Sequence, residues 1–167
     1  MSLSERDARG PEDVESKTRQ PVIVASTIDA SMTDIEIHDF ITRFAAAWAS
    51  RDGEAFLALW HPDGVLHSPL YDRPVRGKEL GRLTDIVKER APDSVWQLLD
   101  WTARGDTVIV EWQNTRTAGG RRFDWRGVDK FRLRDGKIAE ERVYMDTAPL
   151  RAAAEGLTLS PVIALPA

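Results

Sequence analysis

The sequence contains no cysteine, only three histidines and only two tyrosines. Without cysteine the chain can have no disulfide framework, no thiolate metal site and no thiol nucleophile. No apolar run is long enough to span a bilayer, and the N-terminus lacks the basic start and apolar stretch of a signal peptide. We therefore predict a cytoplasmic protein that makes no membrane contact.

An excess of positive charge is also missing. The formal net charge is −4, whereas a nucleic-acid-binding domain usually carries a basic stripe. The sequence thus predicts no nucleic-acid partner. Hydrophobic residues make up 42% of the 167 residues and charged residues 30%, which is typical of a soluble globular domain. The six tryptophans either line a ligand pocket or fill the core.

The chain divides by composition into a tail, a domain and a second tail. Residues 1–31 are polar, charged and broken by Gly10 and Pro11, so we predict a disordered tail. A short apolar run at 21–26 could add an edge strand. The domain is predicted over 32–155. The C-terminal tail, 156–167, is apolar, and we expect its large side chains to cover a groove on this subunit or on a partner, namely Leu157, Leu159, Val162, Ile163 and Leu165.

Hydrophobic periodicity and turn signals predict four helices and five strands. Thr33 and Glu36 form a capping box at the first helix. The predicted helices are 33–50, 54–60, 78–90 and 148–155, and the predicted strands are 65–70, 95–104, 107–117, 122–134 and 137–146. His61 to Gly64 is predicted as a turn. Because helices come first and antiparallel strands later, the predicted fold class is α+β.

Several segments resemble, in order along the chain, the nuclear transport factor 2-like superfamily, which includes ketosteroid isomerases and SnoaL-like polyketide cyclases. The resemblance is carried by residues 44–48 (FAAAW), 51–53, 59–69, 76–79, 127–138 and 144–146. It implies a cone-shaped curved antiparallel sheet wrapped by N-terminal helices, the cystatin-like α+β barrel, with one pocket at its open end and usually a homodimer. It does not fix a reaction, because this fold hosts many functions.

Alternation along 122–134 places one carboxyl group on an apolar face. Asp129 shares that face with Phe123, Trp125, Gly127, Phe131 and Leu133. Burial raises the pKa of such a carboxyl group, and a neutral acid can donate a hydrogen bond to a developing enolate oxygen. The resemblance agrees, since 128–131 matches the segment that holds the isomerases' oxyanion-hole aspartic acid. The alternative is a buried Asp129 paired with an arginine or a backbone amide.

His67 is the second predicted catalytic residue. In the isomerases the general base is an aspartate just before a proline, and the resemblance places Ser68 there. Serine cannot shuttle a proton between carbons at neutral pH, whereas His67 can, because its pKa lies near the working range. Alternation sets His67 opposite Ser68, so both face the pocket only if the strand carries a bulge.

At two other positions where members of this superfamily carry catalytic side chains, this sequence has apolar residues. The position of the isomerases' helix-borne tyrosine is Phe44 here. The cyclases and related epoxide hydrolases carry an acid just before the aromatic residue of the closing strand, and the corresponding residue here is Val143, before Tyr144. We predict a pocket whose ligand-binding residues are Phe44, Trp48, Tyr71, Trp112, Asn114, Trp125 and Val143. Asn114 is alternatively an exposed residue at a hairpin end. No histidine pair has ligand spacing and no glycine-rich loop opens a helix after a strand, so we expect no metal and no cofactor.

The function predicted from these observations is binding of a small apolar molecule of the polyketide, steroid or terpenoid type. Isomerase- or cyclase-type proton transfer, or lyase- or hydrolase-type acid–base catalysis without a metal, would use Asp129 to stabilise an oxyanion and His67 to move the proton. The alternative is a non-catalytic ligand carrier or a dimerisation module of the same fold. The expected partners are the small ligand and a second copy of the chain.

Overall fold

The computed structural model describes residues 32–158. The elements in chain order are α1 (Asp34–Ser50), α2 (Gly53–Ala58), β1 (Trp60–His67), β2 (Val75–Arg76), α3 (Lys78–Arg90), β3 (Val95–Arg104), β4 (Thr107–Ala118), β5 (Arg121–Arg134), β6 (Lys137–Met145) and α4 (Ala148–Ala154). The predicted N-terminal tail, its apolar run and residues 159–167 lie outside the described residues. No helix within 32–158 is long and apolar enough to cross a membrane.

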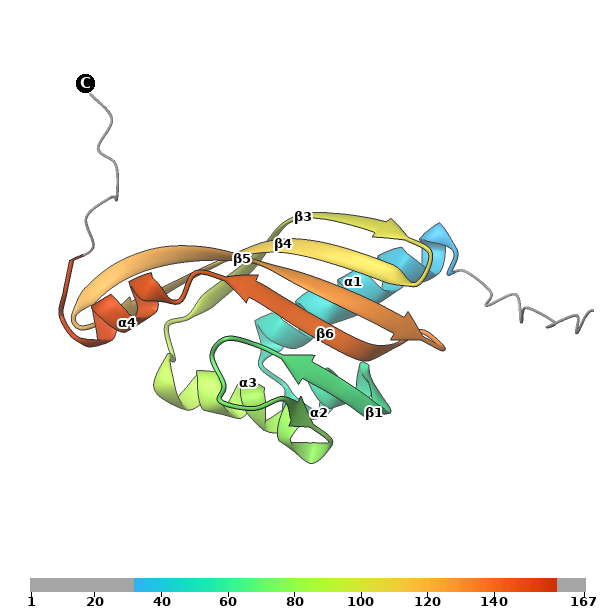
Figure 1. The fold of residues 1–167 in the computed structure, drawn as a ribbon, viewed down its shortest axis with the longest axis horizontal. Helices are drawn as coiled ribbons and strands as arrows, with labels where there is room; N and C mark the ends of the chain where they lie inside the picture. Colours follow the sequence, from blue (N-terminus) through green and yellow to red (C-terminus); the bar gives the residue numbers. More distant parts are fainter. Residues whose placement is uncertain (1–31, 159–167) are drawn as a thin grey trace, which may run out of the picture.

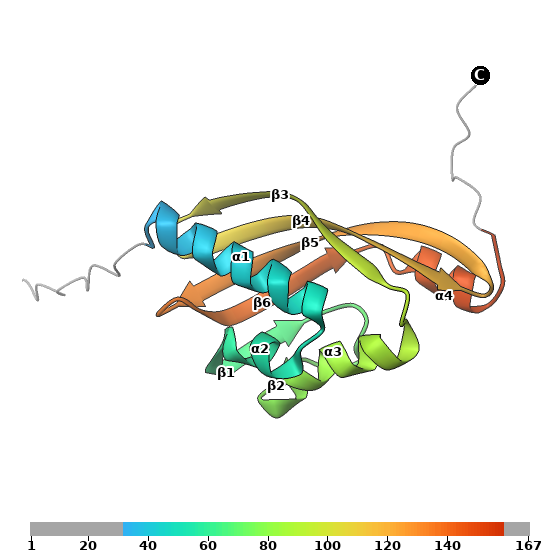
Figure 2. The same ribbon diagram turned by 180° about the vertical axis from the view of Figure 1, so that it is seen from behind.

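The six strands form one sheet in the order β2-β1-β6-β5-β4-β3. Strands β3 to β6 make a long curved antiparallel meander. Helix α1 lies across its concave face, while α2 and α3 pack together beside β1 and β2 (Figures 1 and 2). The α+β prediction is thus confirmed. The predicted all-antiparallel pairing is wrong in one place, because β1 runs parallel to β6 and makes an open, mixed sheet.

Local sequence signals explain how the first two helices begin and end. Thr33 caps α1: its hydroxyl accepts from the Glu36 amide at 3.3 Å, and Glu36 Oε2 accepts from the Thr33 amide at 2.8 Å. The helix ends at Arg51, which has a φ of 53°. Asp52 then caps α2, accepting from the amides of Glu54 at 2.9 Å and Ala55 at 3.1 Å. This short turn places α2 against α3 and against the start of β1.

The predicted turn at His61 to Gly64 is wrong, since these residues lie inside β1. The register against β6 shifts between Trp60 and Val65, so the turn residues form an irregularity within the strand. Gly64 is needed there, because a Cβ atom would lie 2.7 Å from the Ile138 carbonyl oxygen. The two-residue strand β2, which pairs with Val65 and Leu66, was not predicted; it is too short to show a period.

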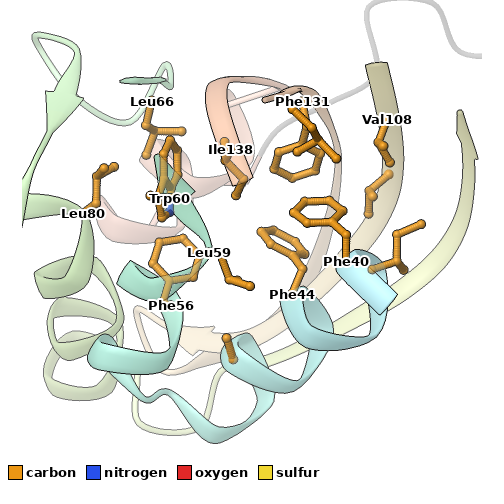
Figure 3. Packing of buried hydrophobic residues seen from close by; sticks show 14 of the residues in the cluster. Phe40, Phe44, Phe56, Leu59, Trp60, Leu66, Leu80, Val108, Phe131 and Ile138 are labelled. Carbon is orange, nitrogen blue, oxygen red and sulfur yellow. The ribbon is translucent and has the colours of Figure 1, made fainter. Parts of the chain in front are cut away.

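The core lies between the concave face of the sheet and helices α1 to α3. Phe40 and Phe44 of α1 project toward Phe131 of β5 (Figure 3), with ring centroids 5.3 Å and 4.9 Å from it and edge-on geometry. Phe56 and Trp60 continue the cluster, with centroids 6.0 Å apart. These rings fill the space between α1 and the sheet. They do not fill the region between α3 and the part of the sheet that carries Trp112 and Trp125, where a cavity lies.

Candidate active site

One cavity opens between the inner face of the sheet, α3 and the loop after β1. Its volume is about 150 Å³. The apolar wall includes Trp48, Phe56, Leu66, Leu70, Leu83, Val87, Trp96, Trp112, Trp125, Val143, Met145 and Leu150, and the polar groups are Ser68, Tyr71, Ser94, Asn114, Arg116, Asp129 and Glu141. A mostly apolar hollow with a few polar groups is typical of a small-molecule site.

Most of the predicted ligand-binding residues lie on this wall, namely Trp48, Tyr71, Trp112, Asn114, Trp125 and Val143. Phe44 does not: it is buried in the core, where it packs against Phe56 and Phe131. Asn114 is not the exposed hairpin residue of the alternative interpretation. Its Oδ1 accepts a hydrogen bond from the Ser94 hydroxyl at 2.7 Å.

Asp129 is buried on β5, as the alternation along the strand predicts. Only 4% of the residue is exposed, and its Oδ1 atom has no hydrogen-bond partner among the described residues. The alternative of an arginine or amide partner at that atom therefore finds no support. Desolvation raises the pKa of Asp129 to about 7, and the nearby Trp112 indole opposes part of the rise.

Glu141 is a second buried carboxyl group, which sequence reasoning missed. It lies on β6 opposite Phe131, while Asp129 lies opposite Val143, so the two acids are diagonal neighbours on one face of adjacent strands. Glu141 is 3% exposed and its Oε2 atom has no hydrogen-bond partner within residues 32–158. Burial first, and the charge of Asp129 second, hold the pKa of Glu141 well above its ordinary value.

A bulge in β6 explains why Glu141 was missed. Leu133 pairs with Ile138, but Arg132 pairs with Glu140, so Ala139 is an extra residue in the ladder. Strict alternation counted from the buried Ile138 would put Glu141 on the outer face. Alternation counted backward from Val143, which also lines the cavity, gives the observed side. Counting backward from Val143 could therefore have identified Glu141 as an inward-facing residue from the sequence.

Tyr71 is a third ionisable group on the wall of the cavity. Burial raises the pKa of its phenol, and the charge of Glu141 raises it further. The hydroxyl therefore stays protonated at neutral pH and can donate a hydrogen bond. The loop that carries it is fixed in part by the Tyr71 amide, which donates to the Ser68 carbonyl at 3.3 Å.

Gly127 permits the Trp112 ring to lie close against the sheet. A Cβ atom at position 127 would be 2.3 Å from Trp112 Cζ2. The two residues face each other directly across β4 and β5, so the missing side chain makes room for the indole beside Asp129. Glycine at this position therefore helps to shape the cavity.

Residues 41–141 match the sequence profile of the SnoaL-like domain. The chain belongs to the SnoaL-like domain family. No curated protein sequence matches this chain. Its family assignment therefore comes from the profile, and the solved structures below support the fold.

Solved structures similar to this SnoaL-like domain include two proteins from Streptomyces. AclR, a proposed hydroxylase from Streptomyces galilaeus, is 24% identical with a TM-score of 0.65, covering 78% of this chain and 87% of that one. IdmH, a proposed polyketide cyclase from Streptomyces antibioticus, is 26% identical with a TM-score of 0.60, covering 71% and 97%. A Catenulispora acidiphila protein with a ketosteroid isomerase-like fold is 20% identical, with a TM-score of 0.63 and coverages of 74% and 98%.

In this SnoaL-like domain His67 lies on the opposite face of β1 from the cavity. Ser68 lines the cavity, whereas His67 borders a surface hollow beside Arg142. Its Nε2 atom is 3.8 Å from Glu140 Oε1. The irregularity in β1 lies upstream of Val65, so it does not bring His67 and Ser68 to the same side. The structure brings Asp129 together with Glu141 and Tyr71 instead.

Proposed function

We propose that this SnoaL-like domain is an acid–base enzyme that moves a proton on a small, largely apolar carbonyl compound of the polyketide, steroid or terpenoid type. The observation that carries the proposal is the pair Asp129 and Glu141, two buried carboxyl groups on the wall of one apolar cavity. Perturbed acids in a cleft are markers of functional sites. Family membership supports the same class of activity.

The pair cannot carry two negative charges at neutral pH, because neither charge is well solvated and each opposes the other. At least one of the two carboxyl groups therefore keeps its proton. Burial raises the pKa of both groups, and the charge of Asp129 raises that of Glu141 further, so we assign the proton to Glu141. Asp129 is then the carboxylate available as a base, which reverses the role predicted for it from the sequence.

In the proposed step Asp129 accepts a proton from the carbon next to the carbonyl group. The electron pair of the broken C–H bond forms an enolate, whose oxygen accepts hydrogen bonds from neutral Glu141 and from the Tyr71 hydroxyl. Asp129 then returns the proton to a different carbon, which completes an isomerisation. In a cyclisation the enolate carbon instead attacks a second carbonyl group of the same molecule, and the resulting alkoxide takes the proton.

The test is deuterium exchange from solvent into a panel of ketones and polyketide-like compounds, followed by mass spectrometry or NMR. Asp129→Asn and Glu141→Gln should each lower the exchange rate by about 10²–10⁴-fold, the usual worth of one acid–base group. Asp124→Asn is the matched control, because Asp124 lies on the exposed face of the same strand. Equal deuterium-exchange rates for the wild type and the two cavity variants would contradict the proposal.

A ligand carrier is the second candidate, favoured by the serine that lines the cavity where the isomerases keep their base. A carrier would show ligand-dependent increases in melting temperature, because a ligand that binds only the native state stabilises it. It would show no deuterium exchange with any compound that stabilises it. Exchange that depends on Asp129 excludes this candidate.

A further inference from the structure

Arg116 places a positive charge on the wall of the mostly apolar cavity. It lies on β4 and lines the cavity with Trp125 and Asn114. Its Nε atom is buried and has no hydrogen-bond partner among residues 32–158. The proposed proton transfer, which needs Asp129, Glu141 and Tyr71, gives this guanidinium no role.

Two aromatic rings hold the guanidinium in place. Arg116 pairs directly with Phe123 across β4 and β5, and Trp125 is the next residue on the same face. The guanidinium carbon lies 5.2 Å from the Trp125 ring centroid and 6.0 Å from that of Phe123, while the two rings stack at 5.4 Å. Stacking on a ring face leaves the N–H groups at the guanidinium edge free to donate to a planar acceptor.

The charge of Arg116 has no close carboxylate partner among the described residues. Within the described part of the chain no carboxylate oxygen lies within 4 Å of it. The charge of Asp93 acts on the Arg116 guanidinium. One Asp93 oxygen, however, already accepts a hydrogen bond from the Thr117 amide at 2.8 Å. A half-buried arginine with a free N–H edge in a ligand cavity is suited to a carboxylate, which it can bind through two parallel hydrogen bonds.

The position of Arg116 determines which end of a substrate it would bind. Val110 is the β4 residue opposite Asp129, and Arg116 is six residues further along β4. At about 3.4 Å per residue this is roughly 20 Å of strand. Inward-facing tryptophans, Trp112 and Trp125, lie between the two ends. The charged end and the acid pair therefore lie at opposite ends of an aromatic surface.

We infer that the substrate of this domain is a two-ended molecule, with an apolar ring body and a carboxylate, or an acidic enol or phenol in its ionised form, that Arg116 binds at the end of the cavity away from Asp129. This deepens the proposed function and rests on it for the reacting end. The anionic group fixes the orientation of the ring body, so that the carbonyl end reaches the carboxyl pair. Arg116 is a binding and orienting residue in this scheme.

The test compares two probes of the same shape and different charge, 2-naphthoate and 2-naphthamide, by calorimetric titration of the full chain at pH 7.5. The wild type should bind the carboxylate more tightly than the amide. Arg116→Met should weaken 2-naphthoate binding by about 10- to 100-fold, as expected for a lost charge-assisted hydrogen-bond pair, and change 2-naphthamide binding less than about threefold. Arg126→Met is the control, since Arg126 is exposed on the opposite face of the sheet.

Arg116→Lys and Arg116→Gln provide a second comparison if Arg116→Met does not fold. Lysine keeps the charge but not the planar fork, so it should retain part of the preference for the carboxylate, and glutamine should lose it. An unchanged ratio of the two affinities in the variants would overturn the inference. So would a wild type that prefers the amide or binds neither probe.

The two proposals can fail separately. Neither probe has a C–H group next to a carbonyl that could exchange, so the titration measures the charged end alone. Exchange that depends on Asp129 with an unchanged affinity ratio would remove the inference and keep the proposed function. A changed ratio without Asp129-dependent exchange would remove the proposed function and keep the anion site.

Discussion

Asp129 and Glu141 are carboxyl groups that the fold keeps out of water, and this has a cost in stability that depends on pH. In the unfolded chain an aspartic acid loses its proton near pH 4, whereas in the folded chain the pKa of Asp129 is about 7. Between these values the folded state binds more protons than the unfolded state. The free energy of unfolding therefore falls as pH rises through this window.

Asp129→Asn should remove the contribution of Asp129 to this pH dependence. At pH 4 both proteins hold a neutral group at the position, so their stabilities should be similar. By pH 8 the variant should be more stable by roughly 4 kcal/mol at most, from about three pKa units at 1.36 kcal/mol each. Urea unfolding of both proteins at pH 4, 6 and 8 measures the difference. A variant that is less stable than the wild type at pH 8 would contradict the raised pKa of this buried group.

At the scale of elements, the bulge in β6 and the glycine in β5 decide what the sheet presents to the cavity. The lengths of α1, α3 and β3 to β6 follow from periodicity and turn signals, and these predictions are confirmed within two residues. The sequence did not reveal the extra residue at Ala139, because a bulge arises from pairing with β5 rather than from the order of residues within β6.

Gly127→Ala tests the close packing of β5 on Trp112. The added methyl group would meet Trp112 Cζ2 at 2.3 Å, and a large rigid ring cannot move aside without entering the cavity. We expect a loss of about 1–3 kcal/mol in the free energy of unfolding, together with weaker ligand binding. Urea unfolding and probe titration measure the two effects. Adding Trp112→Leu should restore stability, and failure of that rescue would show that the clash lies elsewhere.

At the scale of the whole molecule, the outer face of the open sheet carries exposed apolar side chains. Val95, Ile109 and Tyr144 are 48%, 36% and 55% exposed, and the register places Ile109 and Tyr144 on the face away from the cavity. The homodimer expected from the family resemblance stays a prediction, and this face is where we place it.

Ile109→Lys should weaken that dimer, because it places a second lysine beside Lys130, the residue opposite it across β4 and β5, and the added charge would lose its water in the interface. Light scattering coupled to size exclusion should then show a shift from dimer toward monomer at the same protein concentration. Ile35→Lys is the matched control, since Ile35 is 81% exposed on α1 and away from the sheet face. A wild type that elutes as a monomer, or equal behaviour of both variants, would contradict the placement of the interface.

The sequence alone determined the α+β class, the bounds of α1, α3 and β3 to β6 within two residues and the inward position of Asp129, because these depend on local periodicity and on alternation within one strand. Tertiary structure decided the rest. It turned Glu141 inward through a bulge, left His67 outside, buried Phe44 in the core and brought Arg116 beside Trp125. Each of these depends on pairing between strands or on packing across the core, and such contacts join residues far apart in the sequence.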